Sequence, residues 1–248
     1  MTKSCDNAVI LFARDPVLGQ VKTRLSPFLD NETILALYTC FLHDSLDKIR
    51  QVENADLFVG VTPSNQSGFF TGIQGSDIRL FVQEGKDLGD KMRQAIQDRF
   101  AEGYEKVVII GSDSPSLPVS YIERALASDK DMVLGPSTDG GYYLIGMKGA
   151  LTEVFEGVTW GTEKVLQETC DHLVVPGDLL KRDEVETLAT AALERFGGVD
   201  VILHALGGGY GFREPLLEWD QLSILHHLNI GAGAELNRLL APAMREAG

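Results

Sequence analysis

Short apolar segments alternate with helical patterns along most of the chain, and this alternation limits the possible fold more than any other feature. The segments that we expect to form strands are 8–13, 55–61, 78–82, 106–111, 131–135 and 142–146. The segments with apolar residues at helical spacing are 31–50, behind an Asn31 cap, 88–102 and 118–128. This order predicts an α/β fold with a mostly parallel sheet and helices on both faces.

The loops that follow these strands are the expected location of a functional site. In sheets of this type, ligands bind at the carboxyl ends of the strands. The sequence therefore predicts one crevice bordered by the loops 13–24, 111–118 and 135–142.

Composition narrows the class of protein. The 248 residues carry 22 Lys and Arg against 36 Asp and Glu, a net charge of −14, which disfavours nucleic acid as a partner. No run of 18 apolar residues occurs, so we expect no membrane span. The three cysteines are widely spaced, which indicates neither a disulfide framework nor a zinc cluster. A cytoplasmic location is the expectation.

The loop after the first strand carries three basic residues and a glycine. In the segment FARDPVLGQVKTRL these are Arg14, Gly19, Lys22 and Arg24. Glycine allows a phosphate to approach the backbone, and Lys and Arg can neutralise a diphosphate at close range. A solvated turn with surface charges explains the pattern equally well.

An aspartate follows the most strand-like segment, in Gly111-Ser112-Asp113-Ser114-Pro115. A carboxylate at the end of a strand is a common ligand of nucleotide-bound Mg²⁺ or Mn²⁺, because such hard cations prefer oxygen ligands. The alternative is that Asp113 or Ser112 caps the helix that begins after Pro118.

A third loop contains Asp139, Gly140, Gly141 and Tyr142. Consecutive glycines let the backbone lie against a ligand, and the tyrosine offers a ring face and a hydroxyl. Asp-Gly is also the commonest signal of a hairpin turn. The ligand-binding loop and the plain hairpin turn therefore both stay open as interpretations.

Taken together, these motifs carry a family resemblance. FARDPVLGQVKTRL, EGKDLGDKM, VVIIGSDSPSLP, GPSTDGGYYLIG and WGTEKVLQET, in that order, resemble the radical-SAM/selenodomain-associated (arsenosugar-biosynthesis-type) glycosyltransferases, which have a nucleotide-diphospho-sugar transferase (glycosyltransferase-A) fold. The resemblance covers residues 7–170. The family is also distantly similar to molybdenum-cofactor and phospholactate guanylyltransferases.

The resemblance implies a role for each matching residue. Lys22 and Arg24, with Arg14 and Gly19 in the same loop, would bind the nucleotide phosphates, and Asp113 would hold a divalent metal. Asp113 and Asp139 are the catalytic candidates. The residues expected beside the nucleotide are Gly85, Leu88 and Gly89. Those expected in the substrate pocket are Gly140, Gly141, Tyr142, Trp160 and Thr162, with Gly161 in place of the family's usual Ser.

After Thr169 the sequence departs from that family. It lacks the family's DVDTPEDL-like segment, which would supply a second carboxylate, and residues 171–248 instead resemble an internal fragment of a short-chain dehydrogenase/reductase. This tail has neither the TGxxxGxG fingerprint nor a YxxxK pair, so we expect it to bind neither NAD nor NADP. Its predicted elements are strands at 172–175 and 199–206 and helices at 182–196 and 221–246.

The sequence thus predicts two domains, 1–170 and 171–248, the second a β-α-β-α appendage docked on the first. The expected activity is metal-dependent transfer of a sugar from a nucleotide-diphospho-sugar to a small-molecule acceptor. The alternatives are a nucleotidyltransferase of the guanylyltransferase type and a catalytically silent fusion that still binds nucleotide.

Overall fold

The computed structural model describes residues 3–64, 68–73, 77–149, 152–171, 178–196, 199 and 219–247. The chain divides into two compact units, Met1–Leu173 and Val174–Gly248.

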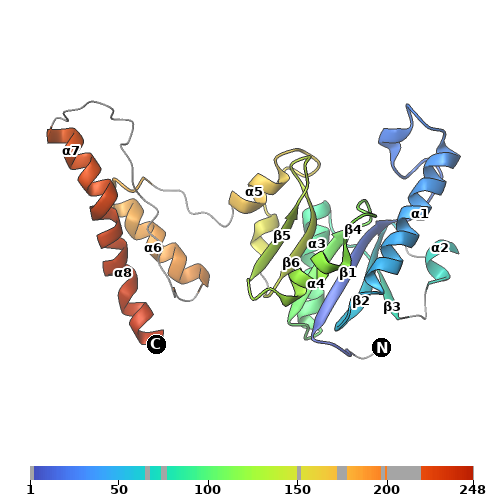
Figure 1. The fold of residues 1–248 in the computed structure, drawn as a ribbon, viewed down its shortest axis with the longest axis horizontal. Coiled ribbons are helices and arrows are strands. Elements are labelled where there is room, and N and C mark those ends of the chain that lie inside the picture. The colour runs from blue at the N-terminus through green and yellow to red at the C-terminus, as the bar shows by residue number, and fades with distance from the viewer. Residues whose placement is uncertain are drawn as a thin grey trace. The chain divides into compact units, whose positions relative to one another are not determined.

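A six-stranded sheet, built from the described residues, forms the centre of the first unit (Figure 1). Its spatial order is β3-β2-β1-β4-β6-β5. The strands are β1 (Asn7–Arg14), β2 (Ala55–Thr62), β3 (Ile78–Val82), β4 (Lys106–Gly111), β5 (Met132–Pro136) and β6 (Tyr142–Met147). The predicted segments are therefore correct to within one residue or so at each end.

Strand direction places the predicted loops at one edge of the sheet. β1 runs parallel to β2 and β4, with Arg14 opposite Thr62 and Phe12 opposite Gly111. β6 is antiparallel to both β4 and β5, so β5 runs in the same direction as β4. The loop 137–141 that joins β5 to β6 consequently lies at the carboxyl edge. The mostly parallel α/β fold is confirmed, with β6 as the reversed strand.

Side-chain caps fix the starts of the two longest helices of this unit. Asp30 accepts a hydrogen bond from the Thr33 amide at 2.8 Å, and Asp87 accepts one from the Asp90 amide at 2.8 Å. The expected Asn31 cap is therefore wrong by one residue, because Asn31 is already helical. The helical segments are η1 (Thr23–Leu25), α1 (Asn31–Ile49), α2 (Gly68–Thr71), α3 (Leu88–Ala101), α4 (Val119–Ala127), η2 (Thr152–Phe155) and α5 (Val165–Asp171).

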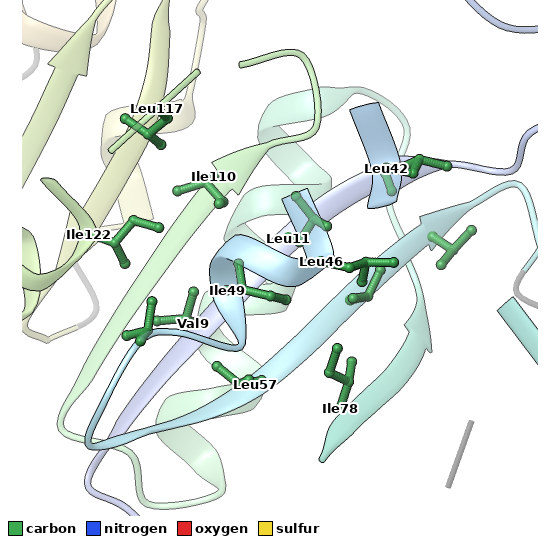
Figure 2. Close-up of a cluster of buried hydrophobic side chains, with 14 of the residues drawn as sticks. Val9, Leu11, Leu42, Leu46, Ile49, Leu57, Ile78, Ile110, Leu117 and Ile122 are labelled. Carbon is green, nitrogen blue, oxygen red and sulfur yellow. The ribbon is translucent and has the colours of Figure 1, made fainter. Parts of the chain in front are cut away.

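Both faces of the sheet are buried, which explains the continuous apolar strands. Val9 and Leu11 of β1 point to the face that α1 and α4 cover, where they meet Leu42, Leu46 and other side chains (Figure 2). The alternate β1 residues, Ala8, Ile10 and Phe12, pack on the other face against Met92, Ala95 and Ile96 of α3 and against η2. The sheet is thus a rigid support for the loops at its edge.

The described part of the second unit is helical. Its segments are α6 (Arg182–Phe196), α7 (Trp219–His226), the π-helical turn η3 (His227–Gly231) and α8 (Ala232–Ala247). α6 packs on α8 through Val185, Ala189, Ala232, Leu236 and Leu240. The predicted helix 182–196 is confirmed, and the predicted helix 221–246 consists of three consecutive segments. The predicted strands 172–175 and 199–206 lie outside the described residues, apart from Val199, and the docking of this unit stays a prediction.

Candidate functional site at the carboxyl edge of the sheet

A cavity of about 650 Å³ opens where β1, β2 and β4 end. This volume is within the usual range for sites that bind small molecules. Residues from the loops after β1, β3 and β4 and from α1 complete its walls. Its polar lining residues are Arg14, Lys22, Thr23, Arg24, Tyr38, Thr62, Gln83, Ser112 and Asp113.

Lys22 and Asp113 meet across this cavity. The Lys22 Nζ lies 2.5 Å from the Asp113 Oδ1. The same ammonium lies 5.8 Å from the ring centre of Tyr38 and 5.9 Å from that of Phe41, both from α1. The Asp113 side chain is 71% exposed and that of Lys22 only 22%. The carboxylate is therefore open to a ligand while the lysine is partly enclosed.

Tyr38 joins the two loops that carry these residues. Its hydroxyl accepts a hydrogen bond from the Arg14 amide at 2.8 Å and donates one to the Arg14 carbonyl at 3.0 Å. The Ser112 Oγ lies 3.4 Å from the same oxygen. Burial raises the pKa of Tyr38, so the hydroxyl stays protonated and able to donate. The sequence shows only a tyrosine at helical spacing, and nothing in that pattern reveals this role.

Lys48 anchors the loop that carries Asp113. This α1 residue is buried, and its Nζ donates to the carbonyls of Ser114 at 3.0 Å and Pro115 at 2.7 Å. Burial lowers the pKa of Lys48, and the nearby Asp44 carboxylate partly offsets this effect. Neither Asp113 nor Ser112 caps α4, which begins at Val119 and has Pro118 as its N-cap residue, with no side-chain cap. The capping alternative is therefore wrong.

Gln83 closes the inner end of the cavity. Its Nε2 donates to the carbonyls of Ala13 at 3.2 Å and Gly60 at 2.7 Å, which uses both of its hydrogens. The two carbonyl partners fix the amide orientation, because the reverse orientation would place three oxygens together. Sequence reasoning missed this residue, since a polar residue after a short strand looks like an ordinary loop position.

A second cavity of about 330 Å³ lies beside the first and shares Phe12, Arg24, Leu88 and Gly111 with it. Its walls come from β6, the β5–β6 loop and the segment before α5. Of the predicted residues it contains Arg24, Leu88, Asp139, Gly141, Tyr142, Trp160 and Thr162. Arg24 therefore stands at the boundary between the two spaces.

Asp139 holds the β5–β6 loop in shape. Its Oδ1 accepts hydrogen bonds from the Ser137 hydroxyl and from the Gly141 amide at 3.2 Å. These bonds, and to a smaller extent the charge of Arg24, lower the pKa of Asp139. The carboxylate is thus ionised and a weak base. It is suited to accept a hydrogen bond from a ligand hydroxyl rather than to remove its proton.

Gly140 and Gly89 allow close contacts that a residue with a Cβ would not permit. The Gly140 carbonyl accepts from the Leu166 amide at 2.8 Å, and a Cβ at Gly140 would lie 2.0 Å from the Glu163 carbonyl oxygen. A Cβ at Gly89 would lie 2.6 Å from the indole of Trp160. These two glycines, which line neither cavity, therefore support the walls. Gly19 and Gly85 also lie outside both linings, in turns with φ of +73° and +143°.

The hydroxyl groups of Tyr142 and Thr162 are less available to a ligand in the second cavity than the sequence predicts. Burial raises the pKa of Tyr142 to about 12, and the Thr169 hydroxyl of α5 only partly offsets this effect. The Thr162 hydroxyl donates to the Thr159 carbonyl at 2.8 Å and accepts from the Lys164 amide at 3.3 Å. Both hydroxyls thus face the protein, and the two residues present mainly apolar surface to a ligand.

The described residues contain no cluster of three or more His, Cys, Asp or Glu side chains placed to hold a metal ion. No helix among them is long and apolar enough to cross a membrane. Asp113 is the one predicted metal ligand, and it lies in the first cavity with the predicted phosphate-binding residues Arg14, Lys22 and Arg24.

One known structure shares both this fold and part of this sequence. The crystal structure of a putative nucleotide-diphospho-sugar transferase from Desulfovibrio desulfuricans G20 is 34% identical over 68% of this chain and 76% of that protein, with a TM-score of 0.64. The chain belongs to the same family. The model of the family DUF2064, described as an uncharacterized protein conserved in bacteria, matches residues 45–162. The fold is thus that of this putative nucleotide-diphospho-sugar transferase.

Other similar structures are more distant. A 4-diphosphocytidyl-2C-methyl-D-erythritol synthase is 13% identical over 71% of this chain and 88% of that protein, with a TM-score of 0.44. A cytidylyltransferase from Leptospira borgpetersenii serovar Hardjo-bovis (strain JB197) is 13% identical over 60% of this chain and 63% of that protein, with a TM-score of 0.40. Among curated proteins, none matches the chain.

Proposed function

We propose that the chain transfers a sugar from a nucleotide-diphospho-sugar to a small-molecule acceptor. The observation that carries this proposal is the pair of adjacent cavities with Arg24 between them. The larger one gathers Lys22 and Arg14, which suit a diphosphate, and Asp113, which suits a cation bound to it. The smaller one offers Trp160 and the ionised Asp139, which suit a sugar ring and its hydroxyls. Membership of the same family as a putative nucleotide-diphospho-sugar transferase supports the same proposal.

The basic residues serve the departing group. In the reaction, the bond between the anomeric carbon and the diphosphate oxygen breaks, a bond from the acceptor oxygen forms, and the acceptor proton leaves to solvent or to a base. Negative charge develops on the diphosphate as it departs. Lys22 and Arg24 stabilise this charge, which is how such positive groups lower a barrier.

The residues present also fit a divalent cation. Asp113 is exposed, accepts a positive group in the structure, and stands in the cavity that we assign to the diphosphate. Mg²⁺ and Mn²⁺ at such sites need one or two carboxylates, with phosphate oxygens and water as the remaining ligands. Asp113 would hold the cation, which would supply further positive charge beside the diphosphate.

A panel of ligands tests the proposal. Thermal unfolding is followed with UDP-, GDP- and CDP-sugars and with nucleoside triphosphates, each with Mn²⁺ or Mg²⁺. We expect a nucleotide-diphospho-sugar to raise the Tm most, because a ligand that binds only the folded state stabilises it. Release of the nucleoside diphosphate, with the sugar passing to an acceptor or to water, would show that the bond at the anomeric carbon breaks. A shift with nucleoside triphosphates alone, with release of pyrophosphate, would contradict the proposal and favour nucleotidyl transfer.

A further inference from the structure

Lys22 occupies a place that is built for a cation. Its Nζ lies 2.5 Å from the Asp113 Oδ1 and within 6 Å of the ring centres of Tyr38 and Phe41. One carboxylate and two aromatic faces thus surround a single positive charge. Aromatic faces attract cations through their quadrupole, and this attraction grows as water is excluded.

The backbone of Lys22 is held in an uncommon conformation. Its φ of 46° and ψ of 39° lie in the left-handed region, directly before the η1 turn. Residues with a side chain avoid this region, and they persist there only where the surroundings impose it. The fold therefore sets the backbone of Lys22 at a point from which its ammonium reaches Asp113.

Asp113 has no second cation among the described residues. Lys22 is its ion-pair partner there, and no other carboxylate, imidazole or thiolate completes a metal-binding group around it. A divalent ion that approaches this carboxylate must displace the ammonium or bind the other carboxylate oxygen beside it. Two positive charges this close to each other repel, which weakens the binding of the second cation.

We propose that Lys22 acts as a competing cation, which keeps Asp113 from binding a divalent metal until a diphosphate arrives. The phosphate oxygens then draw the ammonium away from Asp113 and supply the remaining metal ligands. Metal and nucleotide thus bind with positive cooperativity, through one side chain that both displace. This inference rests on the proposed function for its diphosphate, whereas its first half concerns the protein and metal alone.

Binding of Mn²⁺ to the protein without nucleotide tests the competition. The free Mn²⁺ signal in electron paramagnetic resonance gives the Kd for wild type, Lys22→Met and Lys22→Gln. Both variants remove the charge and keep a long side chain. We expect each folded variant to bind Mn²⁺ at least tenfold more tightly than wild type. Lys22→Arg, which keeps the charge, is expected to bind as weakly as wild type.

Matched variants separate competition from general charge effects. Arg24→Met removes one positive charge from the same cavity without touching Asp113, so we expect less than a threefold change. The double variant Lys22→Met/Asp113→Asn is expected to lose the gained affinity, which is the signature of coupling between the two residues.

Three results would overturn the inference. These are a Kd for Mn²⁺ that Lys22→Met and Lys22→Gln leave unchanged, an equal gain in Arg24→Met, and a gain that survives Asp113→Asn. None of these measurements contains a nucleotide. If no nucleotide sugar binds to wild type, the proposed function fails while the Mn²⁺ comparison still decides the competition.

Discussion

Single residues at this site have separate roles, and a binding measurement can test the role of Lys22. Lys22→Ala is expected to weaken the binding of a nucleoside diphosphate by about 1–3 kcal/mol, the range for a charge-assisted hydrogen bond. Titration calorimetry with the diphosphate and with the bare nucleoside gives both affinities. Because the ammonium is expected to contact the phosphates and not the nucleoside, an equal loss for the nucleoside would show that Lys22 acts through the fold.

Gly89 determines where the indole of Trp160 can lie. A Cβ there would stand 2.6 Å from the ring, so Gly89→Ala forces the indole to move. We expect weaker binding of the nucleotide sugar and a shifted emission spectrum of Trp160, measured in a Trp219→Phe background. Gly68→Ala is the control, because a Cβ at Gly68 has open space around it. An unchanged spectrum and affinity in Gly89→Ala would remove Trp160 from the proposed sugar pocket.

Among the elements, the β5–β6 loop offers the sharpest test of how the second cavity is held. Gly140→Ala places a Cβ 2.0 Å from the Glu163 carbonyl oxygen at a φ of +84°. Left-handed strain and the clash together are expected to cost about 2–4 kcal/mol in the free energy of unfolding. Urea denaturation measures this cost.

The neighbouring glycine is the matched control. A Cβ at Gly141 would meet the Ser137 Oγ at 3.3 Å, and its φ lies outside the left-handed region. We therefore expect Gly141→Ala to change the free energy of unfolding by less than about 1 kcal/mol. Similar costs for the two variants would contradict the close contact between this loop and the segment before α5.

The elements also show how far sequence reasoning reaches. β1 and β4 are predictable because a strand buried on both faces needs a continuous apolar segment, and both have one. The antiparallel direction of β6 is not predictable from the sequence, because the side-chain pattern of a strand is the same in either direction. Helices η1, α2 and η2 were missed, since three or four residues cannot establish a helical period.

The candidate site likewise contains residues that the sequence predicts and residues that it does not. Lys22, Arg24 and Asp113 are predictable because the segments that follow buried parallel strands converge at one edge of the sheet. The sequence does not predict the roles of Tyr38, Lys48 and Gln83, because these roles depend on hydrogen bonds to segments that are distant in sequence. The left-handed backbone of Lys22 also gives no signal, because lysine has no preference for it.

Across the whole first unit, stability depends on a polar cluster at the edge of the sheet opposite the site. The Asp56 carboxylate accepts hydrogen bonds from Ser4 and Tyr104 and pairs with Arg79 at 3.0 Å. Burial opposes ionisation, but the hydrogen bonds outweigh it and lower the pKa of Asp56 to about 2 from an ordinary 3.8. Burial and the bond to Asp56 raise the pKa of Tyr104 to about 12.

The sign of the pH effect follows from the lowered pKa. The folded state binds the Asp56 proton less readily than the unfolded chain, so its stabilisation is full above pH 3.8 and is lost as the pH falls towards about 2. Asp56→Asn is expected to cost about 2 kcal/mol near neutral pH and much less near pH 2. Denaturant unfolding at both pH values measures this, with the exposed Asp47→Asn as control. Parallel pH profiles for wild type and Asp56→Asn would contradict the assignment.

The central claim is that the carboxyl edge of this sheet binds a nucleotide diphosphate and a divalent cation together, through Asp113. The most direct measurement is calorimetric titration of the best nucleotide-diphospho-sugar into wild type and Asp113→Ala, each with and without Mn²⁺. We predict that Mn²⁺ strengthens binding to wild type only, and that Asp113→Ala keeps the wild-type Tm because its side chain is 71% exposed. Equal strengthening by Mn²⁺ in wild type and in a folded Asp113→Ala would contradict the account.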